Sequence, residues 1–122
     1  MHEVSICQSI ISTLEAELNR DEHPYVREIH VKIGLLSYIE PVLLKHAFKY
    51  IKEDTPFQDA ELFTEMVDIT AECEHCGHLF IIEKYKFVCP VCDRPVSNIV
   101  EGKELHINKI ILKVPDYEEI KQ

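Results

Sequence analysis

Two cysteine pairs constrain this chain more than any other feature of its sequence. Cys73 and Cys76 form one C-x2-C pair, and Cys89 and Cys92 form a second pair after twelve intervening residues. Each pair places two thiolates on one tight turn, so that four sulfurs can converge on a single ion. The sequence therefore predicts one tetrahedral metal site built from these four cysteines.

The ion that best suits this site is zinc, because Zn²⁺ is borderline soft and has no geometric preference of its own. Gly77 follows the first pair and Asp93 the second. Glycine takes the positive φ that such turns need, and aspartate tolerates it better than most residues. The alternative is a redox dithiol or a pair of disulfides. Four protein ligands leave no open position for water or substrate, so the predicted zinc site is structural.

Charge and composition limit the classes of function. The chain has 122 residues and a net charge of −9, from 22 acidic and 13 basic residues. An acidic surface opposes binding to nucleic acid, which needs cations against phosphates. The N-terminus lacks the pattern of a signal peptide, and no apolar stretch approaches the length of a membrane span. Since thiols that bind metal point to a reducing compartment, we expect a cytoplasmic protein with no membrane contact.

Hydrophobic periodicity predicts two amphipathic helices. Within residues 1–20 one apolar stripe follows the helical repeat and includes Cys7, which we interpret as a small core residue. A second helix is expected from Pro41 to about residue 53, with Leu44 and Phe48 on its apolar stripe. Asp21 to Pro24 should end the first helix, after a short free start of the chain.

Alternation predicts the strands. The clearest strand covers residues 26–36, and further strands are expected at residues 61–70 and 105–114. Short strand-like runs at residues 80–82 and 85–88 lie between the cysteine pairs. We expect an α+β fold: a three-stranded sheet with two helices on one face, and a small zinc-ribbon-like subdomain, holding the four cysteines, inserted before the last strand. The corresponding domains are residues 1–70 with 101–122, and residues 71–100.

The first three residues offer a second set of metal donors. The α-amine of Met1, the backbone nitrogen and imidazole of His2, and the amide or carboxylate of Glu3 can form adjoining chelate rings. Nitrogen-rich square-planar sites suit Ni(II) or Cu(II), and binding to amide nitrogen releases protons. The alternative is a frayed terminus with no ligand role.

Several segments resemble the HypA/HybF family of nickel metallochaperones for [NiFe]-hydrogenase maturation. They are Met1 to Ser5, Ile33 to Ser37 followed by Glu40-Pro41, the two cysteine pairs, and Glu101 to Leu105. The resemblance covers nearly the whole chain in the family's order. The sequence departs from the family at two turn positions, where Asp54 and Asp93 stand in place of the usual glycine.

The resemblance implies a carrier without catalytic activity. It implies that His2, with the Met1 amine and the Glu3 region, binds Ni²⁺ in the domain of residues 1–70 and 101–122, and that the four cysteines hold Zn²⁺. It also implies delivery of nickel to the hydrogenase large subunit together with the GTPase HypB. A homodimer and a second client, urease, stay open.

Two other functions compete with this interpretation. A rubredoxin-like electron carrier would hold iron in the four thiolates, and a zinc-ribbon adaptor would act on nucleic acid. An enzyme is the poorest alternative, because the sequence shows no phosphate-binding glycine loop and no catalytic triad that can be argued from residue order.

Overall fold

The computed structural model describes residues 2–114, and Met1 and residues 115–122 lie outside this range. The helices are α1 (His2–Glu17) and α2 (Pro41–Ile51), with short 3-10 turns η1 (Arg20–Tyr25), η2 (Leu35–Ser37) and η3 (Lys52–Asp54). The strands are β1 (Val26–Gly34), β2 (Glu61–Val67), β3 (Thr70–Glu72), β4 (Leu79–Ile81), β5 (Ile99–Glu101) and β6 (Leu105–Leu112). None of the helices in this range is long and apolar enough to cross a membrane.

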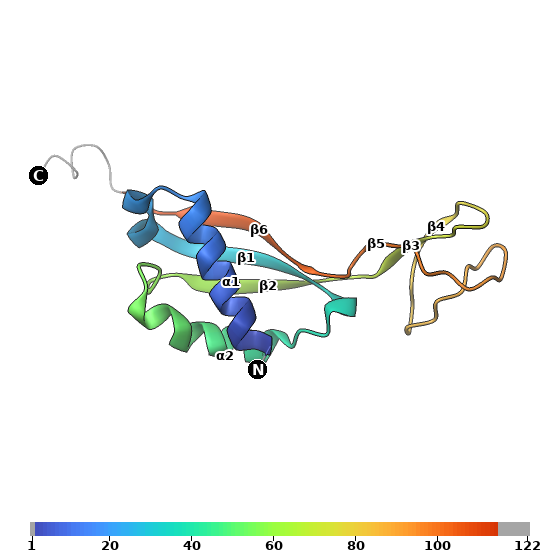
Figure 1. Ribbon diagram of the computed structural model, residues 1–122, viewed down its shortest axis with the longest axis horizontal. Coiled ribbons are helices and arrows are strands. Elements are labelled where there is room, and N and C mark those ends of the chain that lie inside the picture. The colour runs from blue at the N-terminus through green and yellow to red at the C-terminus, as the bar shows by residue number, and fades with distance from the viewer. Residues whose placement is uncertain (1, 115–122) are drawn as a thin grey trace, which may run out of the picture. The chain divides into compact units, whose positions relative to one another are not determined.

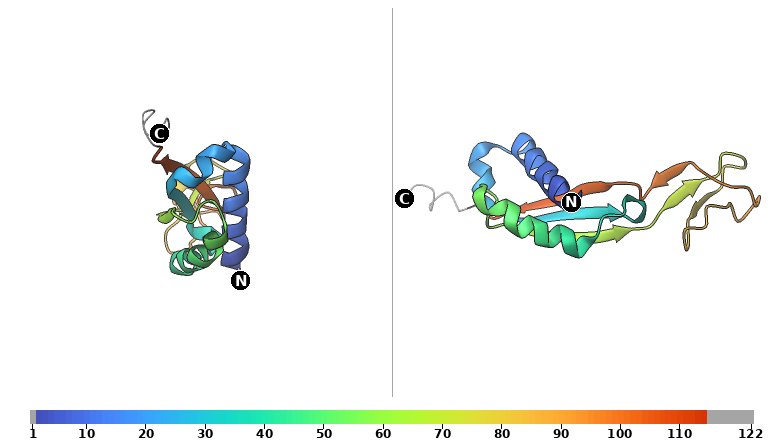
Figure 2. Two further views of the ribbon diagram at one scale, coloured as in Figure 1. Left: turned by 90° about the vertical axis from the view of Figure 1, so that its left-hand side faces the viewer. Right: turned by 60° about the horizontal axis from the view of Figure 1, so that its bottom comes forward.

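Both predicted helices are present, and their apolar stripes form the core. Helix α1 begins at His2 and so leaves a shorter free start than expected. Its residues Cys7 and Leu14 are fully buried. In α2, Leu44 is fully buried and the Phe48 side chain is 1% exposed. The Cys7 thiol donates to the Leu44 carbonyl oxygen at 3.5 Å, which joins the two helices directly. Figures 1 and 2 show α1 and α2 on the same face of a sheet.

That sheet has the order β2-β1-β6, with the clearest predicted strand at its centre. Strand β6 is antiparallel to β1, because Lys113 N–H bonds Tyr25 O at 2.8 Å and Gly34 N–H bonds Glu104 O at 3.1 Å. Strand β2 follows α2 along the chain and runs in the direction of β1 (Figure 1). The expected α+β arrangement of three strands and two covering helices is confirmed.

A second small sheet, of order β4-β3-β5, departs from the expectation. The single strand predicted at residues 61–70 is divided into β2 and β3, which belong to different sheets, and β5 was not predicted. The prediction of a strand at residues 85–88 is wrong. Lys84 and Tyr85 instead form a turn at φ 53° and 57°, and only Val88 makes an isolated bridge, to Pro95. A pattern of only four residues is too short to distinguish a strand from a turn.

The chain divides into two compact units. Unit 1 comprises residues 1–31, 40–64 and 107–122, and unit 2 comprises residues 32–39 and 65–106. Unit 2 therefore extends beyond the segment 71–100 on both sides. Its buried cluster contains Ile69, Ala71, Cys73, Ile82, Cys89 and Val96, with Leu35 and Leu36 packed against it. The cysteine segment thus has its own apolar core, and Leu35 and Leu36, which precede α2 in the chain, pack against it.

Candidate metal centre

The four predicted cysteines converge in unit 2. The sulfurs of Cys73, Cys76, Cys89 and Cys92 all lie within 4.8 Å of one another, and all four thiols are free. The Sγ atoms of Cys73 and Cys92 are 3.5 Å apart, and those of Cys76 and Cys89 are 3.6 Å apart. Metal–sulfur bonds of about 2.3 Å in a tetrahedron place sulfurs about 3.8 Å apart. The geometry of the four donors therefore fits one tetrahedral ion.

The two cysteine pairs have the same backbone geometry. In the first, Gly77 N–H bonds Cys73 O at 2.8 Å, and in the second Asp93 N–H bonds Cys89 O at 2.9 Å. Gly77 at φ 78° and Asp93 at φ 65° take the left-handed conformation that the sequence predicts. Two equivalent turns thus aim two thiols each at a common point.

Backbone N–H groups also point at the sulfurs. His75 N–H donates to the Cys73 sulfur and Val91 N–H to the Cys89 sulfur, each at 3.4 Å. Burial raises the pKa of the Cys73 thiol. The N–H groups of Cys76 and His75 and the neighbouring thiols outweigh this effect and lower that pKa to about 7. Cys73 therefore ionises before Cys76 and Cys92.

The thiols of Cys76 and Cys92 resist ionisation beside this sulfur. The N–H of His78 lowers the pKa of Cys76, but burial and hydrogen bonding among the thiols prevail and raise it to about 12. The Arg94 N–H lowers the pKa of Cys92, but burial and the contacts with the Cys73 and Cys89 thiols prevail and raise it. Four thiolates this close repel one another unless a cation lies between them, so the cluster is built for a metal ion.

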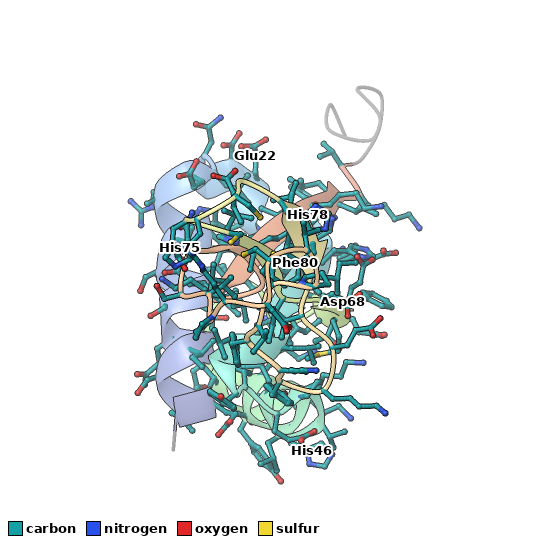
Figure 3. The ribbon with its side chains drawn as sticks, turned by 90° about the vertical axis from the view of Figure 1, so that its right-hand side faces the viewer. Glu22, His46, Asp68, His75, His78 and Phe80 are labelled. Carbon is teal, nitrogen blue, oxygen red and sulfur yellow. The ribbon has the colours of Figure 1, made fainter. Side chains whose placement is uncertain are left out.

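The two histidines beside the first pair do not belong to the donor group. Both His75 and His78 are exposed; His75 Nδ1 lies 3.3 Å from Arg94 Nη1, and His78 stacks on Phe80 with ring centroids 5.7 Å apart. Figure 3 shows the two imidazoles well apart from each other. Among the described residues, the only group of three or more such donors close enough for a metal is the four cysteines.

Glu74 has a structural role at this centre that the sequence did not indicate. Its carboxylate accepts hydrogen bonds from the backbone N–H of Ser97 and of Asn98, each at 3.2 Å, and from the Ser97 hydroxyl at 3.4 Å. This links the first cysteine turn to the chain after the second. A glutamate inside a C-x2-C pair carries no sequence signal for such a contact, because its partners lie 23 and 24 residues further along.

The predicted N-terminal donors are only partly within the described range. Met1 lies outside it, and for His2 the description extends to the backbone, where it is the first residue of α1. A hydrogen bond from its own backbone N–H lowers the pKa of the Glu3 carboxyl, burial partly opposes this, and the Glu40 N–H lowers it further. The Glu3 carboxylate therefore joins the start of α1 to the residue that caps α2.

The other histidines have ordinary surroundings. His30 lies 2.7 Å from a Glu28 carboxylate oxygen and stacks on Phe63, and His46 is exposed on α2. His23 is buried, with Nε2 3.2 Å from Leu18 O and its ring against Phe57. The sequence did not predict that burial, because η1 lies in a polar stretch that carries no apolar pattern.

Comparison with known proteins identifies the family. Residues 1–112 match the family model described as "Hydrogenase/urease nickel incorporation, metallochaperone, hypA". A "Hydrogenase maturation factor HypA" from Campylobacter jejuni is 36% identical over 114 residues, covering 93% of this chain and 100% of that protein. Its counterpart from Aquifex aeolicus is 33% identical, covering 93% of this chain and 99% of that protein.

Solved structures agree with the sequence relatives. The solution structure of the Ni metallochaperone HypA from Helicobacter pylori matches at a TM-score of 0.70 and 25% identity, covering 90% of this chain and 96% of that one. A second HypA solution structure matches at 0.71 and 26% identity, covering 93% and 97%. With its four-cysteine metal site, this chain belongs to the HypA family of nickel-incorporation metallochaperones, which are accessory proteins of hydrogenase maturation rather than enzymes.

Proposed function

We propose that this chain binds Ni(II) at its N-terminus, through the Met1 amine, His2 and the Glu3 region, and delivers it during [NiFe]-hydrogenase maturation. The observation that carries the proposal is the family match from residue 1 onward, which includes the Met1-His2-Glu3 start. Delivery would involve HypB and the hydrogenase large subunit, in the cytoplasm. The four cysteines would hold structural Zn²⁺.

The start of α1 supports nickel binding by backbone nitrogen. The first N–H groups of a helix have no intrahelical partner, so the His2 amide can lose a proton without breaking the helix. The positive end of the helix dipole also favours the amide anion that results. The anchored Glu3 carboxylate would hold this short donor set beside α2.

Reversible loading fits a carrier better than an enzyme cofactor. Ligation by imidazole and amide nitrogen needs deprotonated donors, so nickel affinity should fall as pH falls and the donors regain their protons. A cage of four thiolates would instead retain its ion, which suits the structural role assigned to the cysteines.

A nickel titration of the zinc-loaded chain with its native start tests this proposal. The matched proteins are His2→Ala, a chain with one residue added before Met1, and His46→Ala as a surface control. Calorimetry gives the stoichiometry and the visible d–d band reports a square-planar nitrogen site. We expect the native chain and His46→Ala to bind one nickel, and the two altered starts to lose it while zinc stays bound. Equal binding by all four proteins would place nickel elsewhere.

A further inference from the structure

Helix α2 is a basic element in an acidic protein. Residues 41–52 contain Lys45, Lys49, Lys52 and His46 and no acidic residue, although the whole chain carries a net charge of −9. Helix α1 has the opposite composition, because residues 2–17 include three glutamates and neither lysine nor arginine. A negatively charged partner would be attracted to α2 and repelled by most of the remaining surface.

The cations on the outer face of α2 are available. Both Lys45 and Lys49 are exposed, and within residues 2–114 neither side chain makes a hydrogen bond or an ion pair. Lys52 differs, since its Nζ donates to Ala60 O at 2.7 Å and lies 5.8 Å from the centre of the Phe48 ring. Figure 3 shows His46 pointing away from the ribbon at the edge of the molecule.

Exposed apolar side chains lie among these cations. Val42 is 57% exposed and Tyr50 is 77% exposed, high values for such side chains on a folded surface. A groove of about 450 Å³ runs beside Val42, between α2 and the start of β2. Its walls include buried Phe48 and Leu62 together with Lys45 and Lys49. Tyr50 instead lines a second groove, of about 430 Å³, together with His46, Lys49 and Glu53. Apolar area framed by unpaired charge is typical of a protein-binding surface.

We propose that the outer face of α2, comprising Val42, Lys45, His46, Lys49 and Tyr50, docks an acidic segment of a partner protein that also carries an apolar side chain. The carboxylates of that segment lie against the two unpaired lysines, and its apolar side chain enters the groove beside Val42. Asp59 and Glu61 line the same groove, so a neutral side chain suits its interior better than a carboxylate. This surface is distinct from the cysteine cluster and from the proposed nickel ligands.

Selection from random peptides tests this proposal without assuming the sequence of the partner segment. The full-length, zinc-loaded chain is the target for a phage library of short random peptides, and the winning peptides are then measured by fluorescence anisotropy. The charge-reversed variant is K45E/K49E. Its matched control is K103E/K109E, which makes the same change in net charge at two exposed lysines outside α2.

We expect peptides rich in Asp and Glu with at least one aromatic or aliphatic residue. Binding should weaken about tenfold in K45E/K49E and much less in K103E/K109E, because two local charge pairs become repulsive. Val42→Ser should weaken binding while leaving its salt dependence unchanged. Selection of neutral or basic peptides, or equal losses in both charge variants, would overturn the proposal. So would tighter binding of single-stranded DNA, or a dimer of this chain that K45E/K49E dissolves.

Discussion

At the scale of single residues, Glu74 shows how one carboxylate stabilises a metal turn. It accepts hydrogen bonds from Ser97 and Asn98, whereas Glu72 nearby is exposed and has no such partner among the described side chains. We expect Glu74→Ala to lower the free energy of unfolding of zinc-loaded unit 2 by about 1 kcal/mol, since charge-assisted bonds at a partly exposed site are lost. Denaturant unfolding with zinc present measures this. A similar loss in Glu72→Ala would show that the lost stability does not come from the hydrogen bonds of the Glu74 carboxylate.

The buried thiol of Cys7 should make the free energy of unfolding depend on pH. Burial raises the pKa of its thiol from 9.0 to about 11, and the charge of Glu3 adds to this. Well below pH 9 the thiol is neutral in both states, so its full contribution to stability is present. As pH rises from about 9 to 11 the unfolded thiol ionises while the folded one does not, and stability falls by about 2 kcal/mol.

Cys7→Ala separates this effect from other titrations. The variant has a lower free energy of unfolding at pH 8, because a buried side chain is shortened. Since it has no thiol to ionise, its free energy of unfolding should decrease less above pH 9 than that of the native chain. Denaturant midpoints of both proteins at pH 8, 9.5 and 10.5 give the comparison. Parallel curves for the two proteins would contradict the prediction.

At the scale of elements, a close approach of two glycines connects β1 with the turn between β5 and β6. A Cβ on Gly34 would lie 2.2 Å from the carbonyl carbon of Gly102. A Cβ on Gly102 would lie 2.5 Å from Asp68 O, and Gly102 has φ +91°. Backbone atoms cannot move aside as a flexible side chain can, so neither position has room for a side chain.

Gly77 provides a matched control for this element. It also has a positive φ, +78°, but a Cβ there would meet nothing within 4 Å. We expect Gly77→Ala to cost about 1 kcal/mol from the backbone conformation alone, and Gly102→Ala to cost about 3 kcal/mol or more, because backbone atoms must also shift. Thermal unfolding of the two zinc-loaded variants tests the difference, and equal costs would show that the packing around Gly102 yields easily.

At the scale of the whole molecule, the two units differ in what stabilises them. Unit 1 has a core of helix and sheet side chains, including Leu14, Ile29 and Phe48. Unit 2 has a small apolar cluster that contains two of the four cysteines of the candidate metal site, Cys73 and Cys89. Metal binding must therefore supply much of the folding energy of unit 2, on the order of 10 kcal/mol for thiolate zinc sites.

Removal of the proposed zinc ion should consequently unfold one unit selectively. We expect a strong chelator to abolish the dispersed amide NMR signals of residues 65–106 while helical circular dichroism and the signals of α1 and α2 persist. Reloading with zinc should restore the lost signals and release protons from Cys76 and Cys92, whose pKa values are raised without metal. Loss of both sets of signals together would mean that the two units fold as one.

Features that depend on short spacing could be predicted from the sequence alone. The four cysteines, the left-handed Gly77 and Asp93, and the buried stripes of α1 and α2 follow from local turn geometry and helical periodicity, and the structure has them where the pattern placed them. The proposed nickel ligands stay a prediction of this kind.

Contacts between distant segments could be seen only in the folded structure. The division of the predicted strand 61–70 between two sheets, the inclusion of residues 32–39 in unit 2 and the burial of His23 all depend on contacts between segments far apart in the chain. Local pattern carries no information on such pairings, because the free energy of a strand or a buried side chain depends on the surface that it meets.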